Sequence, residues 1–145
     1  MNDPIYRRLL LLAALLLLVS GFASAQEKKI EKAPIQPTSA ASGSEMYKAY
    51  CAVCHGKDAK GDGPAAAELK VPPPNLTELA KRHDGKYPAD YVATVLRNGA
   101  KAPAHGTADM PVWGPLFSSI SQGDEAQVNQ RISNLTNYIK SLQVK

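Results

Sequence analysis

The sequence predicts a small all-α domain, and two observations support this fold class. Near the C-terminus, apolar residues recur at spacings of four, three, four and three, which places them on one face of a helix: Val128, Ile132, Leu135, Ile139 and Leu142. Elsewhere, no stretch of alternating apolar and polar residues is long enough to indicate a strand, and no internal repeat is evident. We therefore expect about four short helices joined by long loops.

The length and composition indicate one domain with a thin core. The chain has 145 residues, near the usual size of a single domain. Hydrophobic residues make up 44% of it, but part of that share is a leucine-rich stretch near the N-terminus that a folded domain would not use. Small domains with few apolar side chains usually need a disulfide, a metal or a large cofactor. A cofactor is therefore worth seeking.

Residues 1–25 have the pattern of a cleaved secretory signal peptide. Arg7 and Arg8 precede an apolar run from Leu9 to Val19, and Ala23-Ser24-Ala25 forms a small-residue cleavage site. The alternative is an uncleaved membrane anchor, but the run is shorter than the roughly 20 apolar residues of a spanning helix. No cysteine follows the run to anchor a lipid. We expect a periplasmic or secreted protein.

Residues 26–41 are predicted to form a disordered leader, because they contain hardly any large apolar side chains. The folded domain is then residues 42–145. Ser42 and Glu45 have the spacing of a capping box, in which each side chain accepts a hydrogen bond from the other residue's amide. A short helix should follow through Cys51.

The middle of the chain is predicted as a loop and two further helices. Residues 56–74 are rich in Gly, Asp, Ala and Pro, which disfavour regular structure. A second short helix should start after Asn75 or Thr77, and a third should run from Pro88 to Asn98 and end at Gly99. The buried stripe predicted for this third helix is Tyr91, Val92, Val95 and Leu96. Asp124 and Glu125 favour the start of the last helix.

The segment Cys51-Ala52-Val53-Cys54-His55 has the pattern by which two thiols join the vinyl groups of a haem while the adjacent histidine binds the iron. Three other interpretations are a disulfide, a thioredoxin-like redox pair and part of a zinc site. A thioredoxin-like pair needs a βαβ context that is absent here, and structural zinc typically takes four Cys or His ligands. The sequence therefore favours one covalent haem c.

The second axial ligand of the iron is predicted to be Met110. After removal of the signal peptide, the chain has two methionines, and Met46 lies too near Cys51 to reach the opposite face of the ring. Met110 stands in Met110-Pro111-Val112-Trp113-Gly114, which shows no helix or strand pattern. His105 is the competing ligand, because imidazole also binds haem iron. His83 is predicted to be a solvated surface residue.

The charge of the chain gives no sign of nucleic-acid binding. Loss of the signal peptide removes two arginines and one aspartate, so the net charge falls from +4 to +3. Nucleic-acid binding normally shows a clustered basic face. A patch that docks an acidic protein partner is compatible with this mild positive charge.

From Gly43 to Leu142 the sequence resembles the class I cytochrome c family. The matching segments, in the family's order, are Cys51 to Gly56, Pro74-Asn75-Leu76, Met110-Pro111, and the terminal helix with Leu135 and Tyr138. The resemblance implies that the Pro74 carbonyl accepts a hydrogen bond from Nδ1 of His55. It also implies that the first and last helices cross where Gly43 and Tyr47 meet Leu135 and Tyr138. This chain departs from simpler members in the Pro72–Pro74 run and in the longer segment after Trp113.

These features predict a soluble, monomeric one-electron carrier between redox proteins. With both axial positions filled by protein, no open site remains for a substrate, so we do not expect an enzyme. Two alternatives stay open: a haem c subunit of a larger dehydrogenase or oxidase, and a haem enzyme or gas sensor if Met110 does not bind the iron. Membrane association would arise only through a partner complex or an uncleaved signal segment. Methionine ligation in an apolar pocket predicts a fairly positive potential.

Overall fold

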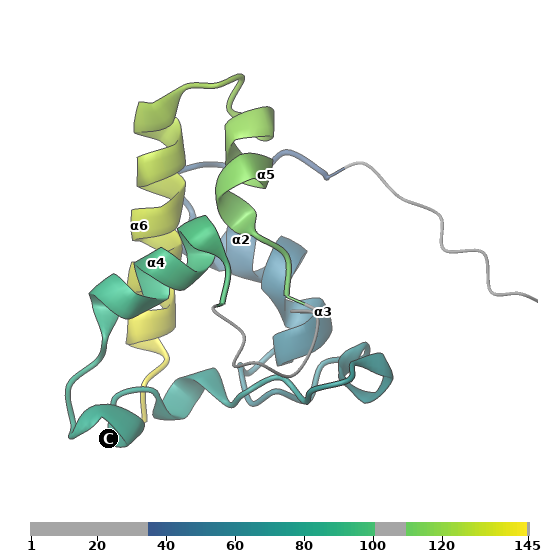
Figure 1. Ribbon diagram of the computed structural model, residues 1–145, viewed down its shortest axis with the longest axis vertical. Coiled ribbons are helices and arrows are strands. Elements are labelled where there is room, and N and C mark those ends of the chain that lie inside the picture. The colour runs from purple at the N-terminus through teal and green to yellow at the C-terminus, as the bar shows by residue number, and fades with distance from the viewer. Residues whose placement is uncertain (1–34, 101–109, 145) are drawn as a thin grey trace, which may run out of the picture. The chain divides into compact units, whose positions relative to one another are not determined.

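The computed structural model describes residues 35–100 and 110–144. The chain divides into two compact units, Met1–Ala33 and Pro34–Lys145, and the described residues belong to the second. Every regular element in these ranges is helical, which confirms the all-α prediction (Figure 1). No helix within these ranges has the length and hydrophobicity needed to cross a membrane. The predicted signal peptide and residues 26–34 of the predicted leader lie outside the described residues.

The first helical run consists of α2 (Gly43–Met46), η1 (Tyr47–Cys51) and α3 (Ala52–His55). Its start is capped as predicted by Ser42, whose Oγ accepts a hydrogen bond from the Glu45 amide at 3.2 Å. The other half of the capping box differs, because the Glu45 carboxylate accepts from the amide of Ser39 rather than that of Ser42. The η1 segment is a wider π-helical turn, a feature often found at functional sites.

The described part of the predicted leader is held against the folded domain. The Gln36 carbonyl accepts a hydrogen bond from Tyr50 Oη at 2.6 Å, and the Thr38 carbonyl accepts one from Arg131 at 2.9 Å. The Asn134 side chain likewise donates to the Ala40 carbonyl. Residues 36–40 therefore do not fit the expected disordered leader. Polar backbone contacts, which the composition does not reveal, hold this segment.

The segment from residue 56 to residue 88 connects the first helical run to α4 through three short 3₁₀-helices: η2 (Ala66–Glu68), η3 (Leu76–Glu78) and η4 (Lys81–His83). The predicted loop 56–74 thus contains one turn of helix. Asn75 caps η3 by accepting hydrogen bonds from the amide and hydroxyl of Thr77, so the predicted second helix starts where expected. His83 is exposed, as predicted.

The third predicted helix is α4 (Ala89–Asn98), which packs against α6. Val92 and Leu96 are buried, but Tyr91, which was expected in the same stripe, is 57% exposed. The ring of Tyr91 lies beside the exposed ring of His83, with centroids 6.1 Å apart. The buried face is therefore narrower than the apolar sequence pattern indicates, because α4 contacts its neighbours along only one side.

The helix α5 (Trp113–Ile120) was not predicted from the sequence. Gly114 and Pro115 indicate a loop, but both fall in the first turn, where the amide groups lack intrahelical partners and proline is tolerated. Gly114 also allows close packing, since a Cβ there would lie 2.3 Å from the Arg97 carbonyl oxygen. The apolar face of α5 is formed by Trp113 and Phe117, one turn apart and buried.

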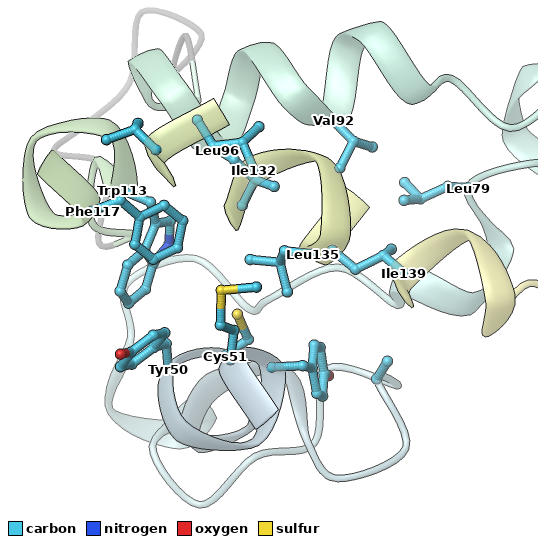
Figure 2. Close-up of a cluster of buried hydrophobic side chains, with 14 residues drawn as sticks. Tyr50, Cys51, Leu79, Val92, Leu96, Trp113, Phe117, Ile132, Leu135 and Ile139 are labelled. Atoms are coloured by element: carbon cyan, nitrogen blue, oxygen red, sulfur yellow. The ribbon is translucent and has the colours of Figure 1, made fainter. Parts of the chain in front are cut away.

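The last helix, α6 (Glu125–Ser141), is the centre of the core and contacts α2, α4 and α5. Its predicted apolar face is confirmed, because Val128, Ile132, Leu135 and Ile139 are all at most 4% exposed. Figure 2 shows Ile132, Leu135 and Ile139 of α6 converging with side chains of α4 and α5, while Tyr50 and Cys51 approach from the first helical run. One apolar core thus holds the four longest helical segments together.

The crossing of the first helical run with α6 has the predicted form. A Cβ on Gly43 would lie 2.2 Å from the Asn134 carbonyl oxygen and 2.8 Å from Tyr138 Cβ. One turn along, the rings of Tyr47 and Tyr138 are 5.5 Å apart. Only glycine allows the two backbones to come this close.

We predict that Gly43→Ala destabilises the domain by about 1–3 kcal/mol, because the added methyl group meets helix backbone that cannot move aside easily. Urea unfolding of the purified protein measures this change. The control is Lys48→Ala on the exposed side of the same helical run, which should change stability by less than about 0.5 kcal/mol. Equal stability of the two variants would contradict the close crossing.

The Asp124 carboxylate caps α6 by accepting hydrogen bonds from the amides of Ala126 and Gln127 and from the Gln127 side chain. The Gln127 side chain and the backbone amides lower the pKa of Asp124. A lowered pKa stabilises the fold above the ordinary value near 3.8, and this contribution disappears as the pH falls through the folded pKa.

We therefore predict that Asp124→Asn, which keeps an oxygen for capping but does not titrate, is less stable than the wild type at about pH 6. The difference should shrink at about pH 3, as measured by urea unfolding at both values. A difference that stays constant across this range would show that the charge of Asp124 contributes nothing.

Candidate haem site

The two cysteines of the motif lie at the junction of η1 and α3 and are both free thiols. Cys51 is 6% exposed and faces the interior, where Figure 2 shows it opposite Leu135 of α6. Burial, together with the nearby Cys54, raises the pKa of Cys51 to about 12. Cys54 is only partly buried. Neither cysteine forms the disulfide considered as an alternative.

The imidazole of His55 is 8% exposed at the end of α3. Its Nδ1 lies 3.4 Å from the Pro74 carbonyl oxygen, the pair implied by the family resemblance. Burial lowers the pKa of His55, and the contact with Pro74 opposes this effect only in part. The ring is therefore neutral at neutral pH, and with Nδ1 directed to Pro74 its Nε2 is the nitrogen free to bind a metal.

The loop after the motif wraps tightly around it. The amide of Gly61 donates to the His55 carbonyl at 2.8 Å, and the amide of Gly63 donates to the Cys54 carbonyl at 3.1 Å. Gly63 has no room for a side chain, because a Cβ there would lie 2.5 Å from the Val53 carbonyl oxygen. From the other side, Tyr47 Oη donates to the Gly56 carbonyl at 2.8 Å. The loop thus fixes the orientation of the turn that bears His55.

The segment that contains Met110 leads into α5, and the start of α5 packs beside the cysteine turn. The Trp113 ring lies 5.4 Å from the ring of Tyr50, the residue before Cys51. Met110 is partly buried and packs against the same apolar cluster. Met46, the methionine excluded as a ligand by its closeness to Cys51 in the sequence, is fully buried within α2. His105, the competing ligand, lies outside the described residues.

The donor set fits a covalent haem better than a zinc ion. One helical turn supplies two free thiols and a neutral imidazole, and an apolar cluster adjoins them. Among residues 35–100 and 110–144, no group of three His, Cys, Asp or Glu side chains is arranged to hold a metal ion. The described ligands therefore do not form the zinc site considered as an alternative.

Two residues near this site were not singled out for their roles by the sequence analysis. Tyr47 was expected only as part of a helix crossing, but its hydroxyl also holds the loop at Gly56. Arg131 is 4% exposed despite its charge. The sequence contains a sign of this burial, because Arg131 is three residues after Val128 and four before Leu135, on the apolar face of α6.

The fold and the site define a haem-binding helical domain, and comparisons with known proteins agree. The family model for cytochrome c matches residues 40–143. Cytochrome c-551 of Bacillus subtilis (strain 168) is 30% identical over 96 residues, which span 66% of this chain and 74% of that protein. No solved structure matches the chain. The chain belongs to the cytochrome c family, and it is a c-type cytochrome, an electron carrier with covalently bound haem c.

We predict that replacing both cysteines, Cys51→Ala with Cys54→Ala, leaves an unfolded or proteolysed apoprotein, because the haem supplies much of a thin core. Extraction with acidified organic solvent should remove no colour from the wild type. Circular dichroism of the double variant gives the second measurement. A folded, haem-free double variant would contradict the structural role given to the haem.

Proposed function

We propose that Cys51 and Cys54 attach the haem, that His55 and Met110 bind its iron, and that the protein carries single electrons between redox proteins outside the cytoplasm. Pro74 positions His55 through the contact between its carbonyl oxygen and Nδ1. The bound haem supplies an iron that changes oxidation state by one electron. The protein's part is to hold that iron with two fixed ligands and to limit the access of water.

The observation that carries the proposal is the placement of His55. The imidazole is neutral, is 8% exposed and contacts the Pro74 carbonyl through Nδ1, while the Gly61 amide holds the backbone carbonyl of His55. A ring fixed in this way undergoes little rearrangement when the charge of a bound iron changes. A carrier needs such rigidity, whereas an enzyme needs an open coordination position.

The proposal of Met110 as the second ligand is supported by its segment. Trp113 packs on Tyr50, so the chain leading out of Met110 lies beside the turn that bears Cys51. The short stretch from Met110 to Trp113 leaves little freedom for Met110 to move away from that region. Two protein ligands would leave no coordination position for a substrate, and the main rival, a peroxide- or gas-binding haem enzyme, requires one.

The location and partners follow from the N-terminal pattern and the charge. Residues 1–25 have the signal-peptide pattern, so we propose a periplasmic or secreted, monomeric protein. Its partners are redox proteins, and the mild positive charge favours acidic docking surfaces. A haem subunit of a larger dehydrogenase or oxidase would use the same site with a fixed partner.

We predict that Met110→Ala retains the covalent haem but loses the far-red iron–sulfur band of the oxidised protein, lowers the midpoint potential and lets the ferrous protein bind carbon monoxide. A visible spectrum in both redox states and a redox titration measure these changes.

The matched control is Met46→Leu, a volume-conserving change at the other methionine of the described residues, which should keep the far-red band. His105→Ala should keep it as well. An unchanged band in Met110→Ala, or its loss in His105→Ala, would overturn the proposed ligand. A carbon monoxide complex of the unmodified ferrous protein would favour the enzyme.

A further inference from the structure

Arg131 is a buried cation whose hydrogen-bond partners are neutral. It stands on α6 with 4% of its surface exposed. Its Nε donates to Ser121 Oγ at 3.0 Å, and its Nη1 donates to the carbonyl and the hydroxyl of Thr38 at 2.9 and 3.2 Å. These oxygens accept hydrogen bonds from Nε and Nη1 but do not cancel the charge of the guanidinium.

No carboxylate in the described parts of the chain forms an ion pair with Arg131. Arg82 pairs with Glu78 and Arg97 pairs with Glu125, and these four side chains are between 37% and 69% exposed. A charge removed from water without an opposite charge beside it is costly to the fold. Its field is also screened less by solvent than that of a surface charge.

This charge lies close to the haem attachment turn. The Nη1 atom of Arg131 is 4.0 Å from the sulfur of Met46, in the same helical run as Cys51. Leu135, one turn after Arg131 on α6, faces Cys51 across the core (Figure 2). Thr38 also connects the guanidinium to the residue before Cys51, because its Oγ1 lies 2.9 Å from Tyr50 Oη. Arg131 is thus joined to the cysteine turn through buried and part-buried protein groups, where electrostatic interactions act over longer distances than in water.

We propose that the buried charge of Arg131 raises the midpoint potential of the haem iron. The inference depends on the proposed one-electron function and adds a specific residue to it. Reduction lowers the positive charge at the iron by one unit, so a nearby uncompensated cation destabilises the oxidised form more than the reduced form. Ser121 and Thr38 hold the cation in place through their hydrogen bonds. Thr38 therefore helps to position a charge that acts on the iron.

The first test removes the charge. Arg131→Gln should lower the midpoint potential, whereas Arg131→Lys should stay close to the wild type. We expect a shift of about threefold in the equilibrium constant for electron exchange. This is about 30 mV, since a tenfold change corresponds to about 59 mV for one electron. The same change at an exposed position, Lys140→Gln, should have a smaller effect that disappears at high salt.

The second test keeps Arg131 and cancels its charge. Ser121→Asp places a carboxylate beside Nε and should lower the potential, whereas Ser121→Asn, of similar shape and no charge, should not. This pair separates an electrostatic role from a structural one, because both variants disturb packing to a similar extent. It also remains informative if Arg131→Gln fails to fold.

The measurements are redox titration, thermal unfolding and the far-red band, all on the haem-loaded protein. The role of the charge would be overturned if Ser121→Asp and Ser121→Asn had equal midpoint potentials. It would also be overturned if Arg131→Lys lowered the midpoint potential as much as Arg131→Gln. Failure of the proposed function would look different, since the haem would then be absent or the far-red band missing in the wild type. A drop in stability with no change in potential would show that Arg131 only anchors residues 36–40.

Discussion

The close approach of the first helical run to α6 is the contact on which the rest of the domain depends. At Gly43 the two backbones come so near that a single methyl group would overlap the Asn134 carbonyl. This crossing fixes the helical run that ends in Cys51 and His55 relative to the apolar face of α6. Because α4 and α5 pack on the same helix, the crossing sets the position of every element around the site. A small domain with a thin core gains rigidity from such a contact without needing more apolar surface.

The site is built by backbone hydrogen bonds more than by side chains. Amides of the loop after the motif donate to the carbonyls of Val53, Cys54 and His55, so the turn that carries the two cysteines and His55 is held along its length. Burial then sets the chemistry, because it keeps the imidazole of His55 neutral. Covalent attachment and a rigid ligand suit a protein whose charge changes while its structure should not. The proposed role of the buried Arg131 also depends on rigidity, since a fixed cation would act on the charge of the iron at a constant distance.

Much of the site could be predicted from the sequence, because it rests on spacing along one turn of helix. The motif from Cys51 to His55 and the apolar series of α6 both depend on residues near one another in the chain. The errors arose where distant parts of the chain meet. Tyr91 belongs to an apolar pattern but lies outside the contact between α4 and its neighbours, and α5 forms despite Gly114 and Pro115 because its first turn tolerates them. Residues 36–40 are polar and yet held by Tyr50, Arg131 and Asn134.

The sequence by itself determined the helical class, the haem motif and the face that α6 buries, since each follows from periodicity or local chemistry. Only the tertiary structure decided that the Thr38 carbonyl meets Arg131, that Trp113 lies on Tyr50 and that a charged residue, Arg131, is enclosed in the core. The physical reason is the range of the interactions. Patterns of nearby residues report which side of a helix is apolar, whereas the burial of a charge and the partner of a carbonyl depend on residues tens of positions away.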